Sequence, residues 1–137
     1  RRPRALVLDR VHLTPGDAGA EQAVVTLRHH GAVGVGTAPG TDAPSIAAAT
    51  LQAIRVIVDG AVGPDAAAEL VGGVEVVEAE QESAAPEAPD RWEGRTRLAR
   101  LGGWQALGRA RDRRRADAVA RSTLDATNRA LGDLLPD

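Results

Sequence analysis

Two stretches of this chain, about half its length apart, repeat the same pattern of small residues. The tripeptide Gly-Thr-Ala at residues 36–38 precedes a polar loop and then the segment AAATLQA at residues 47–53. The tripeptide Gly-Arg-Ala at residues 108–110 precedes another polar loop and then ARSTLDA at residues 120–126, with a slip of one residue between the two parts. A duplicated unit that buries only one face must bury it against its twin or against another subunit. The repeat therefore predicts two related units arranged about an approximate twofold axis.

The first unit carries the pattern of three strands followed by a helix. Apolar alternation between turn residues predicts strands at residues 4–13, 20–29 and 32–37. An apolar stripe at helical spacing predicts a helix at residues 44–58, which Asp42 or Ser45 is placed to cap. Asp59-Gly60 is expected to end this helix.

The second unit repeats this order. Its predicted strands lie at residues 74–78, 95–101 and 104–110, and its helix lies at residues 116–131. Antiparallel meanders with the helices on one face form an α+β sandwich. The predicted fold is therefore a duplicated βββα unit with an antiparallel sheet, helices on one face and pseudo-twofold symmetry.

At 137 residues the chain is expected to form a single domain. The predicted parts are repeat one at 4–60, a connector with a short helical turn at 61–72, repeat two at 73–132, and a flexible acidic loop at 79–90. The 79–90 segment is rich in Glu, Ala and Pro and lacks apolar periodicity, which is typical of a solvated loop.

The apolar residues are small, which limits the core. Phe, Tyr and Met are absent, and Trp92 and Trp104 are the only aromatic residues of the sequence. Small side chains each bury little area, and a thin core often needs a partner subunit to complete it. Composition alone therefore favours a homodimer.

Charge and cysteine content exclude several classes of protein. All 17 basic residues are Arg, a bias that a GC-rich genome explains, and the net charge of −2 gives no general attraction to nucleic acid or to an anionic membrane. Without Cys there is no disulfide framework, thiol nucleophile or thiolate metal site. No apolar run is expected to span a membrane, and no signal-peptide pattern opens the chain, so a soluble cytoplasmic protein is expected.

The strongest local signal is a cluster of arginines. Residues 91–121 contain ten Arg, whereas residues 70–90 contain six acidic residues and no Arg. Four of the ten lie at or just before the second helix, at positions Arg111, Arg113, Arg114 and Arg115. Helix N-termini attract anions, and Arg adds bidentate recognition of carboxylate or phosphate. The alternative is a solvated loop that the acidic segment neutralises. Nucleic-acid binding is disfavoured, because few aromatic residues are available to stack on bases.

Other motifs do not predict chemistry. His29 and His30 are neighbours on a strand and point to opposite faces, so they do not form a metal site. The GAVGVG segment at residues 31–36 lies within a predicted hairpin, whereas a dinucleotide site needs it between a strand and a helix. Thr50 and Thr123 occupy matching helical positions without a His–acid pair to activate them. The sequence therefore predicts no enzyme, no cofactor and no metal.

The order of elements resembles the C-terminal regulatory domain of 2-isopropylmalate synthases, which is related to that of citramalate synthases. The resemblance is carried by Ala-Val-Val-Thr-Leu at residues 23–27, by Gly40 before the first helix, by Val-Glu-Val-Val at residues 74–77, and by the segment from Gly108 to Asn128. It implies a dimerising domain in which feedback amino acids bind near the strand-to-helix loops at the dimer interface. The chain departs from the family in having Ala110 where a Gly is usual. The resemblance therefore does not imply that this chain binds leucine. The catalytic barrel of these enzymes is absent from this sequence.

These observations combine into one functional hypothesis and two alternatives. The first is a stand-alone, non-catalytic regulatory and dimerisation domain that senses a small anionic metabolite at the strand-to-helix loops. The candidate ligand-binding residues are Gly40, Asp42, Gly108, Arg111, Arg113, Arg114 and Arg115. The alternatives are a ligand-free scaffold that docks a larger protein and, less favoured, a nucleic-acid-binding adaptor.

Overall fold

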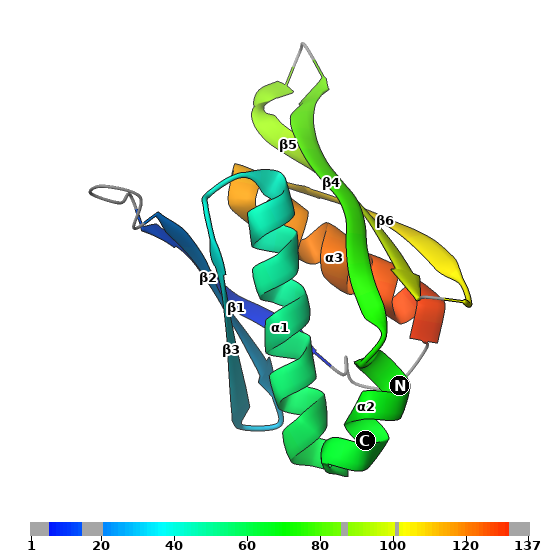
Figure 1. Ribbon diagram of the computed structural model, residues 1–137. Coiled ribbons are helices and arrows are strands. Elements are labelled where there is room, and N and C mark those ends of the chain that lie inside the picture. Colours follow the sequence, from blue (N-terminus) through cyan, green and yellow to red (C-terminus); the bar gives the residue numbers. More distant parts are fainter. Residues whose placement is uncertain (1–5, 15–20, 86–87, 101, 132–137) are drawn as a thin grey trace.

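The computed structural model describes residues 6–14, 21–85, 88–100 and 102–131, and the side chains of residues 84–90 lie outside this description. Two βββα units follow one another, joined by a short helix (Figure 1). The first unit consists of β1 (Val7–Thr14), β2 (Gln22–His29), β3 (Ala32–Pro39) and α1 (Ala43–Val62). After α2 (Pro64–Val71), the second unit consists of β4 (Val74–Ala85), β5 (Ala88–Arg100), β6 (Gln105–Asp112) and α3 (Arg115–Leu131). The predicted α+β fold is confirmed.

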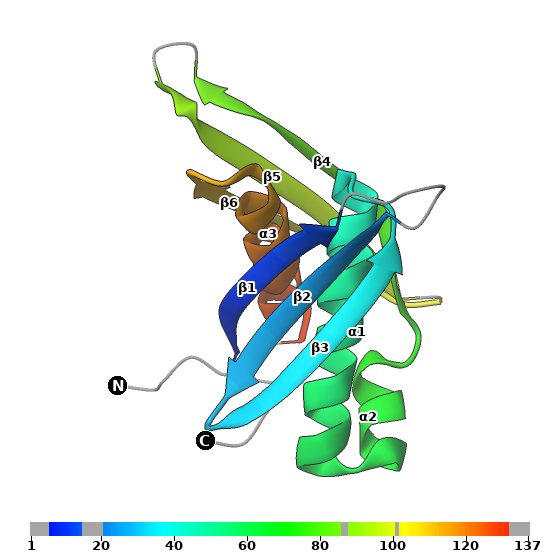
Figure 2. The ribbon, with the colours of Figure 1, turned by 90° about the vertical axis from the view of Figure 1, so that its left-hand side faces the viewer.

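Each unit folds as an antiparallel meander covered by its own helix. The strand orders are β1-β2-β3 and β4-β5-β6, in two separate sheets. Helix α1 packs on β2 and β3, and α3 packs on β5 and β6. The two helices also contact each other, so they lie between the sheets (Figures 1 and 2). In addition, α1 contacts β4 and α3 contacts β1, so each helix touches the first strand of the other unit.

Matching contacts in the two units account for the sequence repeat. A Cβ at Gly36 would lie 1.9 Å from the carbonyl oxygen of Ala49, and a Cβ at Gly108 would lie 2.0 Å from that of Ser122. The backbone N–H of Thr37 donates to Gln52 Oε1 on α1, and that of Arg109 donates to Asp125 Oδ2 on α3. Each helix thus lies directly on a glycine of its third strand and accepts a hydrogen bond from the backbone N–H of the next residue in that strand. The repeated sequence specifies this close approach of helix to sheet.

The core is built from aliphatic and small residues on both helices and on the strands that they cover. Leu27, Ile46, Ile54 and Leu98 are among the largest fully buried side chains. The matching residues Thr50 and Thr123 are also fully buried, and their hydroxyl groups donate to the carbonyl oxygens one turn earlier. These hydroxyls therefore satisfy their hydrogen bonds within the helices, as helical Thr commonly does.

The first helix is longer than predicted. Gly60 lies inside α1, and the helix ends at Val62 because Gly63, with a φ of +89°, turns the chain and donates its N–H to Asp59 O. Burial of Ile57 and Val58 on the apolar face outweighs the low helix propensity of Gly60. The helical turn predicted in the connector is confirmed as α2.

The acidic segment is not a loop, contrary to the prediction for residues 79–90. Strand β4 continues to Ala85 and β5 begins at Ala88, so the hairpin extends beyond the helices (Figure 1). Glu78 and Glu80 lie opposite Arg97 and Arg95 of β5. The alternating glutamates are stabilised by cross-strand arginines rather than by an apolar face.

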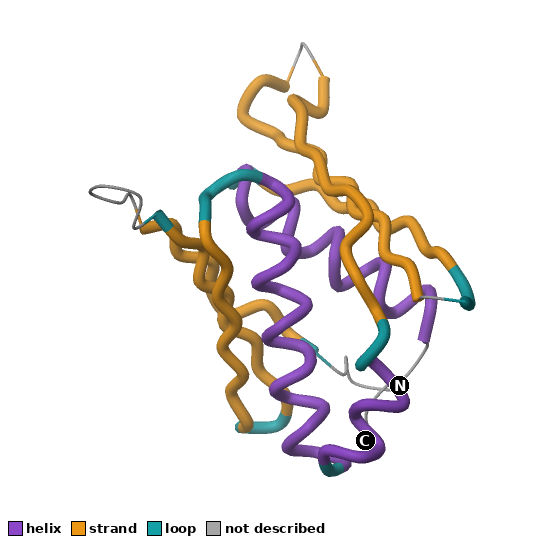
Figure 3. The backbone as a smooth tube through the Cα atoms, viewed as in Figure 1, coloured by secondary structure: helices purple, strands orange, loops and turns teal. Residues whose placement is uncertain are grey.

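By length and composition alone, α1 could cross a membrane. Half of the 18-residue apolar stretch of α1 is buried within the fold. The helix packs on strands of both sheets and on α3 (Figure 3). The expectation that no apolar run is long enough to span a membrane was wrong, because α1 has 20 residues. Its contacts are those of a core helix.

Candidate functional site

The two predicted strand-to-helix loops lie at the same end of the molecule. Helices α1 and α3 both begin there, as the two perpendicular views show (Figures 1 and 2). The first loop joins β3 to α1 and contains Gly40 and Asp42, and the second joins β6 to α3 and contains Arg113 and Arg114. The structure therefore brings the loop residues of both repeats to one end of the fold.

The first loop is held by its own hydrogen bonds. Gly40 has a φ of +98°, and its N–H donates to Glu21 O at 2.9 Å. Asp42 Oδ1 accepts the backbone N–H of Ser45 at 3.0 Å and so caps α1, while the Ser45 hydroxyl donates to Pro39 O at 2.7 Å. Hydrogen bonding from the Ser45 side chain, and then from its backbone N–H, lowers the pKa of Asp42. Gly40 and Asp42 thus shape the start of α1.

Replacing Asp42 by alanine is expected to lower the free energy of unfolding by about 1 kcal/mol, because the first turn of α1 loses its cap. The folded-state pKa is depressed, so this contribution is fully present above the unfolded-state pKa of about 3.9 and is lost as the pH falls through the lower folded value. Urea unfolding of both proteins at neutral and strongly acidic pH measures this difference. An equal deficit at both pH values would contradict the assignment.

The second loop is ordered by partners on the neighbouring hairpin and on α3. Arg111 Nε lies 3.3 Å from Glu93 Oε1, and the Arg115 guanidinium lies 5.6 Å from the centre of a Trp92 ring. Asp112 Oδ1 accepts the Arg114 backbone N–H at 3.1 Å, and Asp112 Oδ2 accepts from Arg121 Nε at 3.0 Å. Asp112 therefore supports the start of α3, as Asp42 does for α1.

Two of the four predicted arginines have exposed guanidinium groups without a close partner in the described part of the chain. The guanidinium groups of Arg113 and Arg114 make no hydrogen bond or ion pair with any residue in the described ranges, and both residues are exposed. Asp117, in the first turn of α3, has a raised pKa, chiefly because it is partly buried and next because of the negative charge of Asp112. The positive charges of Arg114 and Arg121 act in the opposite direction and lower this pKa, so Arg114 interacts electrostatically with Asp117. The loop thus presents two exposed guanidinium groups beside a helix N-terminus.

Gly108 does not belong to this loop. It is buried in β6, where α3 covers it so closely that an added Cβ would lie 2.3 Å from Ala126 N. The structure gives Gly108 a packing role. The interpretation of this glycine as a ligand contact overlooked that its repeat partner, Gly36, has the same contact with α1.

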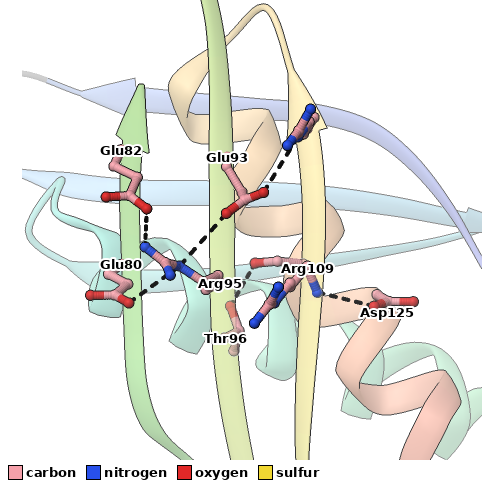
Figure 4. A network of polar contacts seen from close by, with 9 residues as sticks. Glu80, Glu82, Glu93, Arg95, Thr96, Arg109 and Asp125 are labelled. Carbon is pink, nitrogen blue, oxygen red and sulfur yellow. Dashed lines mark hydrogen bonds and ion pairs between the residues drawn. The ribbon is translucent and has the colours of Figure 1, made fainter. Parts of the chain in front are cut away.

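A charge network that sequence reasoning missed covers the outer face of the second sheet (Figure 4). Arg95 pairs with Glu80 at 3.3 Å, with Glu93 at 3.9 Å and with Glu82. Arg97 pairs with Glu78 at 3.4 Å across the same two strands. The spacing of two between successive Glu and Arg residues was the signal in the sequence. Because each of these carboxylates lies against an arginine, the network stabilises the long hairpin.

Metal and nucleophile chemistry finds no support in the described part of the chain. No group of three or more His, Asp or Glu side chains there could hold a metal ion. The rings of His29 and His30 instead contact each other edge to face, with centroids 4.4 Å apart. The buried hydroxyls of Thr96 and Ser122 lie 2.7 Å apart, and Ser122 also donates to Val119 O. These hydroxyls connect β5 to α3 inside the core.

No protein-family model and no curated protein matches this sequence. The roles of its residues therefore rest on the geometry described above.

Proposed function

We propose that this chain is a non-catalytic regulatory and dimerisation module, similar to the regulatory domain of 2-isopropylmalate synthases, that binds a small anionic metabolite in the cytoplasm. The observation that carries the proposal is the pair of exposed guanidinium groups of Arg113 and Arg114 at the start of α3, which make no hydrogen bond or ion pair with the described residues. Free backbone N–H groups at a helix N-terminus and bidentate guanidinium groups both favour carboxylate or phosphate.

The surrounding contacts support a role in transmitting a signal. Arg115 on Trp92 and Arg111 on Glu93 tie the loop to the long hairpin. Helix α3 in turn contacts α1 and β1 of the other unit. An anion bound at the start of α3 would stabilise the arrangement of the two units in which its contacts are best, and a partner would respond to that arrangement. The thin core favours a homodimer as the responding assembly.

The test is calorimetry of the wild-type chain with two anionic probes, acetyl-CoA and ADP, repeated with Arg113→Ala and Arg114→Ala. We expect at least one probe to bind, and each substitution to weaken its binding by about tenfold, because a charge-assisted hydrogen bond is lost. Arg129→Ala is the matched control, since Arg129 is an exposed arginine at the other end of α3, paired with Asp125. Unchanged affinity in both loop variants would remove the loop from the proposal.

A ligand-free scaffold is the second candidate, and the outer face of the first sheet favours it. Val7, Val33 and Val35 are each about half exposed there, and Val7 and Val33 flank Arg28 in the same cross-strand row. Clustered apolar side chains on a surface often mark a contact with another protein. Failure of both anionic probes to bind would favour this candidate over the sensor.

A further inference from the structure

We propose that the groove between α1 and α2 binds a small aliphatic zwitterion, a molecule with one ammonium and one carboxylate group on a short carbon chain. Helix α2 lies beside the end of α1 that is farther from the strand-to-helix loops (Figures 1 and 3). The groove is lined by residues 52–59 of α1 and by α2. It is therefore a second site, separate from the one in the proposed function.

The groove is open to solvent, and its volume and apolar lining suit a small molecule. Its volume is about 390 Å³, within the range usual for ligand pockets. Its apolar walls are formed by Val56, Pro64, Ala67, Ala68 and Val71. Val56 is 46% exposed although it lies on the apolar core helix α1. An aliphatic chain in the groove would cover this valine.

Arg55 holds a positive charge at one end of the groove. Its Nε donates to Val71 O at 3.3 Å, and its Nη2 donates to Val74 O just beyond the end of α2. These bonds fix the guanidinium beside the groove. A guanidinium has five N–H donors, so three remain for a carboxylate.

Asp59 supplies the opposite charge one helical turn further along α1. It also lines the groove, and its carboxylate has no hydrogen bond or ion pair with any residue that the structure describes. Residues four apart on a helix can form an ion pair, but the Arg55 guanidinium instead donates to Val71 O of α2 and Val74 O of β4. The groove therefore contains two charges of opposite sign that do not satisfy each other.

This arrangement selects among ligands by charge. A simple amine is attracted by Asp59 and repelled by Arg55, whereas a simple acid is attracted by Arg55 and repelled by Asp59. Only a ligand with both groups matches both side chains. The apolar walls between them accommodate a short aliphatic frame rather than a polar one.

The test compares four probes of similar size by calorimetry: norvaline, 5-aminopentanoate, pentylamine and pentanoate. We expect at least one zwitterion to bind at concentrations up to about 10 mM, and the amine and the acid to bind about tenfold more weakly. Asp59→Asn is expected to weaken zwitterion binding about tenfold, and Ala68→Leu to abolish it by filling the groove. Glu69→Gln, an exposed acid on α2 that does not line the groove, is the control.

Three results would overturn the inference. The first is that neither zwitterion binds, and the second is that Asp59→Asn binds as the wild type does. The third is loss of zwitterion binding in Arg113→Ala or Arg114→Ala, which would place the ligand at the strand-to-helix loop instead. Because the loop variants are expected to bind the zwitterion normally, failure of this site and failure of the proposed function are distinguishable.

Discussion

Replacing Gly36 or Gly108 by alanine is expected to lower the free energy of unfolding by about 3 kcal/mol or more. The added Cβ at Gly36 would lie 1.9 Å from Ala49 O and 2.5 Å from Ala53 N, and the distances at Gly108 are nearly the same. These atoms belong to helix backbone, so no side-chain rotation can relieve the overlap. The helix must move away from its sheet, and the close packing of the whole unit is lost with it.

Guanidinium unfolding followed by circular dichroism measures this effect. Gly60→Ala is the matched control, since Gly60 lies inside α1 and a Cβ there would meet nothing within 4 Å. That substitution should raise the free energy of unfolding by about 0.5–1 kcal/mol, because alanine is the better helix former. The two unit glycines should give losses within about 1 kcal/mol of each other, since equivalent sites in a duplicated fold carry equivalent strain. A neutral Gly36→Ala would show that the helix–sheet contact is looser than described.

The order of elements was predictable because its signals are local. Turn residues separate the strands, and the helices carry an apolar stripe at helical spacing. The repeated glycine before each Ala-rich helix also identified the two units as relatives, and the structure explains it by the contacts of Gly36 and Gly108 with α1 and α3. A pattern that involves one element, or two elements adjacent in sequence, can be recognised from the sequence alone.

The acidic hairpin was not predictable from periodicity, because its stabilising partners are remote. Glu80 and Arg95 are 15 residues apart and meet only through the register of β4 on β5. An apolar pattern is absent because the outer face is made of charges instead. Composition alone cannot distinguish a solvated acidic segment from a strand whose acids have partners across the sheet.

The candidate site also has one part that the sequence predicts and one part that depends on contacts between distant residues. Asp42 and Ser45 were the two candidate caps from their positions at the start of α1, and Asp42 caps that helix. Charge density located the arginine loop but could not tell the paired arginines from the free ones. Arg111 meets Glu93 through strand register, and Arg115 meets Trp92 across the start of α3, so only Arg113 and Arg114 remain for a ligand.

Replacing Ile54 by alanine is expected to lower the free energy of unfolding by about 2–5 kcal/mol, a large part of the 5–15 kcal/mol that stabilises a typical domain. Ile54 is fully buried on α1, the helix that packs on the first sheet, on β4 and on α3. With no Phe, Tyr or Met in the chain, few large side chains are available to fill the resulting cavity. Val56→Ala on the same helix is the control and should cost less than about 1 kcal/mol, because Val56 is 46% exposed.

The same variant tests whether the two units fold together. Trp92 and Trp104 both lie in the second unit, so tryptophan fluorescence follows that unit, whereas far-ultraviolet circular dichroism follows the helices of both. Because α1 contacts α3 and β4, the Ile54→Ala transition should move by the same amount with either probe. A fluorescence midpoint that stays at the wild-type value while the circular dichroism midpoint falls would mean that the second unit is stable without the first. The contacts of α1 with α3 and β4 would then not couple the unfolding of the two units.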